Sequence, residues 1–262
     1  MRILDLTPEH FPLYRACLED YSADMLEAGD HKVRWYESMR DRGLRVKLAE
    51  DDDGRIVGMI QYLPIEFSGA EGRDLYFVLC IWVHGHRQGP GNRQRRGLGR
   101  ALLEAAEADV RALGAAGLAA WGLRIPVWMR ASWFRRHGYR VAHRQGLMAL
   151  VWKPFRDDAV PPRWRPAGRT PAAGDHGVRV TAFVCGWCPA QNMVVERARR
   201  AAAELGDVAF ELVETRSSDT LDGWAWKDVV FVDGKQLGGG PPPAYARVLR
   251  RIERARRRKH PA

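Results

Sequence analysis

Residues 94–100 of the 262-residue chain have the composition of a phosphate-binding loop. The stretch Gln-Arg-Arg-Gly-Leu-Gly-Arg follows an apolar run that ends at Val83 and precedes a helical pattern. Backbone N–H groups in the first turn of a helix lack intrahelical partners and can bind an anion, and glycines at 97 and 99 allow its close approach. A Gly-x-Gly pair also fits an ordinary turn, so the prediction depends on this strand-loop-helix context.

A second candidate site is the motif Cys185-Gly-Trp-Cys188-Pro. It lies where a predicted strand meets a predicted helix, a position that lowers the pKa of a thiol. A structural zinc site usually needs four ligands, and no second Cys-x-x-Cys or paired histidine accompanies this one, so the pattern favours redox chemistry. Three alternatives stay open: an active dithiol, capture of a metal or metalloid, and a pair without function.

Histidines 84 and 86 lie between the apolar run and the phosphate loop. Histidine titrates near neutral pH, so His84 is a candidate general base. Two solvated loop histidines are an equally good interpretation. Cys80, inside the apolar run, is expected to be a small buried hydrophobic residue.

The elements that must position these residues form a mixed α/β pattern in the first half. A strand over 1–6 and two amphipathic helices over 8–40 precede three strands, at 45–49, 56–67 and 75–83. A helix follows the phosphate loop and ends at Gly114. A strand at 118–123, a helix at 126–137 and two further strands complete a domain of 1–153.

Five prolines between 154 and 177 predict a semi-rigid linker there. Beyond it, a strand at 178–184, a helix, strands at 209–214 and 229–232 and a last helix predict a small βαβ-βα domain over 178–253. A basic tail over 254–262 follows. The two halves show no internal repeat.

The formal charge of +10 falls in two places: residues 250–259 carry +6, and 93–100 carry four arginines without an acidic residue. The arginines suit a phosphate loop, whereas the tail fits a solvated helix end better than a nucleic-acid arm. The longest apolar run, 75–83, is too short for a transmembrane helix, and the N-terminus lacks a signal peptide. We therefore expect a cytoplasmic protein.

The first half resembles the GNAT superfamily of N-acetyltransferases. Gln94, Gly97 and Gly99 occupy the three defining positions of its Q/R-x-x-G-x-G/A motif, and residues 133–139 are similar to its F-Y-x-x-x-G-F element. The resemblance implies the GNAT-type acyl-CoA acyltransferase fold with acetyl-CoA as cofactor. It assigns cofactor binding to the end of the apolar strand and to the loop: Ile81, Trp82, Val83, Gln94, Arg95, Arg96, Gly97, Leu98, Gly99 and Arg100.

By this resemblance a neutral amine attacks the thioester, a strand N–H polarises its carbonyl, and a base removes the amine's proton. The sequence departs from the family where a tyrosine often protonates the leaving thiolate, because Phe134 stands there. The acid is therefore unassigned.

The second half resembles a YoaP-type thioredoxin-like domain, in which Cys185 is the exposed attacking thiol and Cys188 the resolving one. The Gly-Gly-Pro-Pro-Pro stretch at 239–243 strengthens this match. The usual cis-proline position has Trp226-Lys227-Asp228 instead, which puts substrate docking in doubt. Trp187, Trp224 and Trp226 are candidate walls of the site or core residues.

We therefore expect an acetyl-CoA-dependent N-acetyltransferase that acts on a primary amine of a small molecule or protein, with the second domain as thiol relay or regulator. One alternative is a thiol-disulfide or metalloid-handling protein whose first half only binds CoA. Another is nucleic-acid binding through the tail. The sequence indicates no metal site and no membrane partner, and it leaves a homodimer open.

Overall fold

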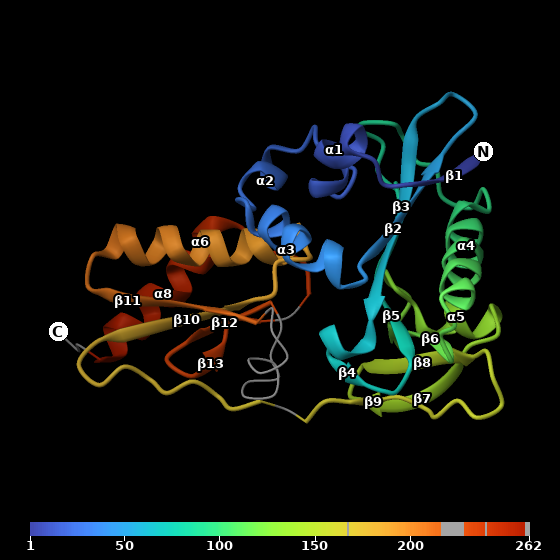
Figure 1. Cartoon of the computed structure of the whole chain (residues 1–262). Helices are drawn as coiled ribbons and strands as arrows, with labels where there is room; N and C mark the ends of the chain where they lie inside the picture. The colour runs from blue at the N-terminus through green and yellow to red at the C-terminus, as the bar shows by residue number, and fades with distance from the viewer. Residues whose placement is uncertain (167, 216–227, 239, 260–262) are drawn as a thin grey trace. The chain divides into compact units, whose positions relative to one another are not determined.

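The computed structural model describes residues 1–166, 168–215, 228–238 and 240–259, and it divides the chain into two compact units (Figure 1). The first unit contains Met1–Tyr21 and Met39–Arg165, and the second contains Ser22–Ser38 and Pro166–Ala262. The division falls inside the expected linker. The first unit differs from the expected continuous domain over 1–153 in that residues 22–38 pack with the second unit.

A seven-stranded mixed sheet in the order β1-β2-β3-β5-β6-β8-β7 forms the centre of the first unit. Only β5 and β6 pair in parallel; every other neighbouring pair is antiparallel. The strands are β1 (Arg2–Asp5), β2 (Arg45–Glu50), β3 (Ile56–Pro64), β5 (Leu75–Val83), β6 (Gly117–Leu123), β7 (Arg140–Gln145) and β8 (Met148–Pro154). The mixed α/β class and this strand sequence agree with the expectation.

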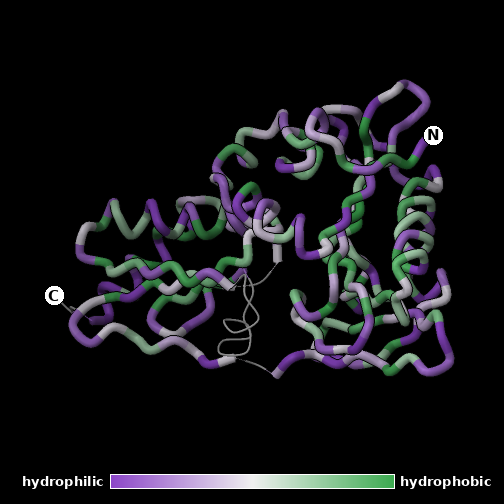
Figure 2. Tube along the Cα trace, viewed as in Figure 1, coloured by the Kyte–Doolittle hydropathy of each residue, from purple (hydrophilic) through white to green (hydrophobic). Residues whose placement is uncertain are grey.

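Helix α4 (Leu98–Ala112) packs on this sheet through one apolar face. Its residues Leu102, Ala106 and Val110 are fully buried, as are most of those of β3. Gly58 of β3 permits the close approach, since a Cβ there would lie 3.1 Å from a methyl group of Leu102. Figure 2 shows hydrophobic residues concentrated on these elements, whereas the β2–β3 turn is hydrophilic.

The helices before β2 are shorter than the two expected over 8–40. The chain instead forms η1 (Pro8–His10), α1 (Phe11–Arg15), α2 (Ala23–Leu26), α3 (His31–Met39) and η2 (Arg40–Arg42). Positive φ angles of 51° and 66° at Cys17 and Leu18 and of 62° at Gly29 interrupt a continuous helix. Helix α5 (Ala131–Arg136) is also shorter than expected.

The first part of the expected linker belongs to the first unit. Strand β9 (Arg163–Trp164) pairs with β4 (Ala70–Glu71), which follows the short helix η3 (Ile65–Phe67). The side chain of Arg165 donates hydrogen bonds to the carbonyls of Ser68 and Glu66. These backbone contacts explain why the boundary lies after Arg165.

The second unit contains a four-stranded sheet in the order β11-β10-β12-β13. Strand β10 (Val178–Val184) is parallel to β11 (Val208–Glu214) and antiparallel to β12 (Val229–Val232), which pairs with β13 (Lys235–Gln236). Helices α6 (Pro189–Leu205) and α8 (Tyr245–Lys259) complete its core. This is the expected βαβ-βα order with one additional short strand.

Charged contacts join residues 22–38 to α6. Arg197 is only 5% exposed and donates to Glu27 and Asp24 at 2.8 and 3.1 Å. His31 lies 2.8 Å from Glu196 through Nε2, and this hydrogen bond lowers the pKa of the Glu196 carboxyl to about 2. A buried arginine needs such partners, so these carboxylates fix the segment on the helix.

Helix α8 continues through most of the expected basic tail. Lys259 donates to the Gly177 carbonyl at 2.7 Å, and Arg256 donates to Asp207 at 2.6 Å. The expectation of a frayed end is therefore wrong as far as Lys259, because these bonds fix the last turn; residues 260–262 lie outside the described residues. None of the described helices is long and apolar enough to cross a bilayer.

Candidate active site

The N-terminus of α4 lies where the sequence predicts the anion site. Gly97 is its N-cap residue, with φ at +81°, and no side chain caps the helix. The first intrahelical bond runs from the amide of Ala101 to the Gly97 carbonyl. The amides of Leu98, Gly99 and Arg100 therefore have no intrahelical acceptor and can bind an anion together with the helix dipole.

Gln94 shapes this loop from inside. Its Nε2 donates to the Val83 carbonyl at 3.2 Å, and its amide donates to Asn92 at 2.9 Å. A Cβ at position 85 would lie only 2.3 Å from Nε2 of Gln94, so Gly85 makes room for the contact. Gln94 thus ties the loop to the end of β5 through its side chain. The residues after Gln94 are the remaining candidates for contact with an anion.

Two of the four loop arginines are bound by carboxylates elsewhere. Arg93 lies 3.4 Å from Asp51, and Arg100 donates to Glu104 of its own helix at 2.7 Å. Arg95 and Arg96 are exposed and form no hydrogen bond or ion pair within the described part of the chain. Arg93 and Arg100 therefore already have carboxylate partners, and anion binding stays a prediction for Arg95 and Arg96.

The edge of β5 that faces β6 becomes unpaired halfway along the strand. The parallel register runs from Leu75 to Val78 and then ends, whereas β3 pairs with β5 along its whole length. The indole N–H of Trp121 donates to the Leu79 carbonyl at 2.8 Å, and that of Trp128 donates to the Ile81 carbonyl at 3.2 Å. Trp128 therefore occupies an acceptor on the strand expected to bind the pantetheine arm.

His84 is buried and bonded at both ring nitrogens. Its Nδ1 lies 2.8 Å from the Gly91 carbonyl, and its Nε2 lies 2.7 Å from the hydroxyl of Tyr21. A carbonyl only accepts, so Nδ1 carries the proton and Nε2 of the neutral ring accepts from Tyr21. The interpretation as a solvated loop residue is wrong for His84, which has no exposed surface.

Tyr21 is a residue that the sequence did not single out. It is 38% exposed, and a Cβ at Gly89 would lie 2.3 Å from its ring, so the loop closes around it. Burial and the neighbouring carboxylates Glu19 and Asp20 raise the pKa of its phenol. The phenol of Tyr21 is therefore a weaker acid than that of a free tyrosine and stays a hydrogen-bond donor to His84.

His86 and Phe134 have contrasting surroundings. The side chain of His86 is 54% exposed and lies 3.3 Å from Glu19, as expected for a solvated loop histidine. Phe134 has no exposed surface and packs edge-on against Tyr139, with ring centroids 5.4 Å apart. Phe134 is thus a core residue.

The profile of the acetyltransferase (GNAT) family matches residues 7–124 of this chain. Residues 7–124 form a GNAT acetyltransferase domain. The chain is accordingly an acyltransferase. Part of this domain, Ser22–Ser38, belongs structurally to the second unit. A search of curated proteins gives no match.

Solved structures give weaker likenesses. A GNAT family acetyltransferase from Brucella melitensis, solved with acetyl-CoA, is 18% identical, with 60% of this chain and 89% of that chain covered and a TM-score of 0.40. The YhbS N-acetyltransferase of Escherichia coli, solved with CoA, is 17% identical, with 60% of this chain and 82% of that chain covered and a TM-score of 0.43. A ribosomal-protein-alanine N-acetyltransferase from Brucella melitensis is 19% identical, with 59% of this chain and 100% of that chain covered and a TM-score of 0.43.

The cysteine pair lies outside the acetyltransferase domain, at the start of α6. Cys185 is 4% exposed and Cys188 is 9% exposed, and both are thiols. The expectation that Cys185 is exposed is wrong, because α3 lies against the motif. A Cβ at Gly186 would lie 2.7 Å from the carbonyl oxygen of His31 and 3.1 Å from Cβ of Trp35.

Polar side chains fix the backbone of the motif. Oδ1 of Asp228 accepts from the amides of Cys185 and Gly186 at 2.9 and 3.2 Å, and Asn192 donates to the Gly186 carbonyl at 2.8 Å. Trp187 is partly buried, whereas Trp224, Trp226, Lys227 and Gly239 lie outside the described residues. Within the described part, no group of three or more potential ligand side chains is arranged to hold a metal.

Replacing Trp128 with phenylalanine should strengthen acetyl-CoA binding. The substitution keeps an aromatic ring but frees the Ile81 carbonyl, and one hydrogen bond corresponds to roughly a 2- to 10-fold change in KM. Steady-state kinetics with acetyl-CoA as the varied substrate measure this. Trp121→Phe is the matched control, since it frees only Leu79, and its KM should not fall. A KM for Trp128→Phe equal to or above that of the unmodified protein would contradict the interpretation.

Proposed function

We propose that the chain is an acetyl-CoA-dependent N-acetyltransferase that acetylates a primary amine of a small molecule or protein. The observation that carries this proposal is the uncapped N-terminus of α4 next to the unpaired edge of β5. Anion-binding amides and a free strand edge are what a pyrophosphate joined to a pantetheine arm requires.

The residues of the loop fit this donor. The amides of Leu98, Gly99 and Arg100 would hold the pyrophosphate, with Arg95 and Arg96 adding positive charge. The ring of Trp133 lies 3.5 Å from the position of a Cβ at Gly99, so a larger side chain there would meet the ring and the ligand together. The carbonyls of Ile81 and Val83 already accept from Trp128 and Gln94, so their backbone N–H groups would pair with the pantetheine arm. The bound donor supplies a thioester carbonyl.

The Tyr21–His84 pair handles the proton in this proposal. Gly91 holds the His84 proton at Nδ1, so Nε2 is the basic atom and Tyr21 is its donor. The ammonium form of the substrate gives a proton to the Tyr21 oxygen while the phenol proton passes to Nε2 of His84, and the amine, now neutral, attacks the thioester. Tyr21 then protonates the leaving thiolate and regains a proton from Nε2 of His84, and the new amide nitrogen loses its second proton to solvent. The pair thus fills the acid role that Phe134 leaves open, and His84 acts through Tyr21 as a base.

Tyr21→Phe should lower kcat about 100-fold and leave the affinity for acetyl-CoA within about 2-fold, because the ring remains but proton transfer is lost. Pre-steady-state and steady-state kinetics over pH 6–9 measure the loss. Tyr76→Phe, at the far end of β5, is the control and should keep its rate. An unchanged pH profile of kcat in Tyr21→Phe would remove the pair from the mechanism.

Gly97→Ala tests donor binding. Its φ of +81° strains any residue with a side chain. Gly114, at the other end of α4, is the matched control, since its φ is +78° and a Cβ meets no atom within 4 Å at either position. Both alanine variants should lose about 1 kcal/mol of unfolding free energy. Only Gly97→Ala should weaken acetyl-CoA binding, by tenfold or more in calorimetry, because it distorts the anion-binding turn. Equal affinities of the two variants would overturn the assignment.

We also propose that the second unit is a thioredoxin-like regulator of this activity. The parallel β10–β11 pair with α6 between them, followed by antiparallel β12, supports that fold. Burial of both thiols against α3 favours regulation over relay, since a relay needs an exposed thiol. Residues 22–38 belong to the acetyltransferase sequence, so a change at Cys185–Cys188 reaches that domain along the chain. A cytoplasmic location would keep the pair reduced.

Oxidation with diamide, which removes two electrons and two protons from a dithiol, tests this regulation. Mass spectrometry should show a Cys185–Cys188 disulfide, and acetyl transfer should change at least threefold and return with dithiothreitol. The variant Cys185→Ser/Cys188→Ser keeps Cys17 and Cys80 and should not respond. Disulfide formation without any effect on the rate of acetyl transfer would overturn the regulatory role, whereas disulfide formation in a protein that transfers no acetyl group would favour the alternative, a thiol-handling protein whose first unit only binds CoA.

A further inference from the structure

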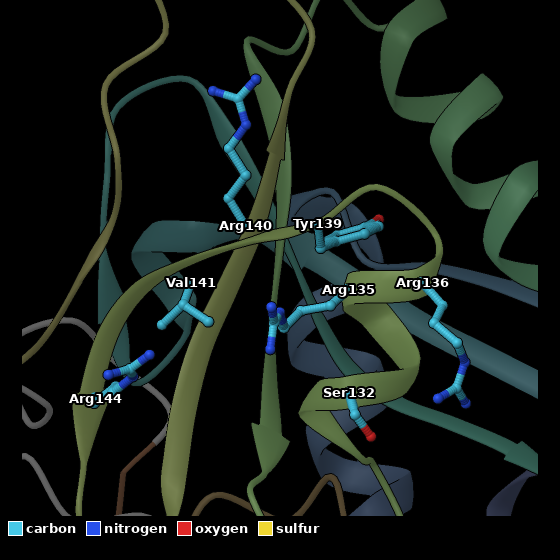
Figure 3. A pocket seen from close by; sticks show the side chains of 7 residues that line it. All are labelled: Ser132, Arg135, Arg136, Tyr139, Arg140, Val141 and Arg144. Atoms are coloured by element: carbon cyan, nitrogen blue, oxygen red, sulfur yellow. The ribbon is translucent and has the colours of Figure 1, made fainter.

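Four arginines contribute to the lining of an open pocket of about 690 Å³ on the first unit. Arg135 and Arg136 come from α5, and Arg140 and Arg144 come from the edge strand β7 (Figure 3). Ser132, Tyr139 and Val141 complete the lining. In Figure 3 the side chain of Arg135 extends from the helix towards the strand.

These guanidinium groups have no counter-charge. In the part of the chain that the structure describes, none of the four forms a hydrogen bond or ion pair. Other arginines of the unit do, for example Arg45 with Asp109 at 2.7 Å and Arg163 with Glu71 at 2.8 Å. Four like charges around one pocket repel each other, and a bound anion would relieve that repulsion.

The sequence accounts for the missing partners. Residues 110–156 contain eight arginines and one lysine but no aspartate or glutamate. The net charge of the whole chain does not reveal this stretch, because acidic residues elsewhere offset its positive charge. The stretch covers α5 and β7 completely, so neither element can neutralise its own arginines.

The pocket is distinct from the donor loop. Ser132, Arg135 and Arg136 of α5 follow the spacing of one helical face, whereas Trp133 on the neighbouring face lies against Gly99. None of the lining residues belongs to 94–100. The arginine pocket and the donor loop therefore lie beside different faces of α5.

We propose that this pocket binds a small ligand with two or more phosphate groups. Guanidinium forks bind phosphate oxygens in pairs, and four of them on two elements match more than one phosphate. The volume lies within the range of about 300–1,000 Å³ that is usual for small-ligand sites. The Ser132 hydroxyl adds a hydrogen-bond donor at the rim.

Calorimetric titration of the full chain with sodium tripolyphosphate tests the proposal. One saturable site is expected, and Arg135→Ala/Arg144→Ala should weaken it tenfold or more, because each charged contact corresponds to roughly a tenfold change. The matched control is Arg15→Ala/Arg55→Ala, which removes two exposed arginines of the same unit that do not line the pocket. Thermal unfolding shows whether both variants are folded.

Equal weakening in both double variants, or no saturation, would mean unspecific attraction to a basic surface and would overturn the proposal. A second titration with the protein saturated with CoA separates the sites. Unchanged affinity for tripolyphosphate supports a separate pocket, and competition would place it in the donor site and overturn it. ATP in place of tripolyphosphate should bind at least as tightly, whereas binding of a single-stranded oligonucleotide alone would contradict a small-ligand site.

Discussion

The first unit depends on the separation of β5 from β6 after their first four paired residues. Each backbone N–H and C=O on a buried strand edge requires a partner, so a sheet that opens must supply substitutes. Here three side chains donate hydrogen bonds to alternate carbonyls of β5: the indoles of Trp121 and Trp128 and the side-chain amide of Gln94. The opening, the loop tied to its end and the anion-binding helix terminus are consequences of one interrupted ladder.

Local patterns in the sequence predicted the elements with long, regular apolar spacing. The strands β3 and β5, the helix α4 and the Gly97 turn follow from such spacing together with the need for a positive φ. The region before β2 was predicted less well, because Cys17 and Leu18 adopt left-handed backbone that no residue type there indicates. Tertiary contacts decide its path, which local propensity does not encode.

For the candidate sites, too, the sequence indicated only the groups whose residues are neighbours in the chain. Gln94, Gly97 and Gly99 are neighbours in sequence, so their motif was visible. Tyr21 and His84 are 63 residues apart, and no local signal joins them. The burial of Cys185 had the same cause, since the covering helix α3 lies far away in the chain. The arginine pocket had a signal, the absence of acidic residues over 110–156, but a net charge over the whole chain concealed it.

The second unit is built from two pieces of chain separated by more than a hundred residues. Ser22–Ser38 is synthesised more than a hundred residues before α6, its packing partner. Trp35, 1% exposed in the folded chain, must wait unpacked until Gly186 and α6 exist. Such a segment is a natural contact for a chaperone during synthesis, and it makes completion of the C-terminal half a condition for completing the N-terminal one.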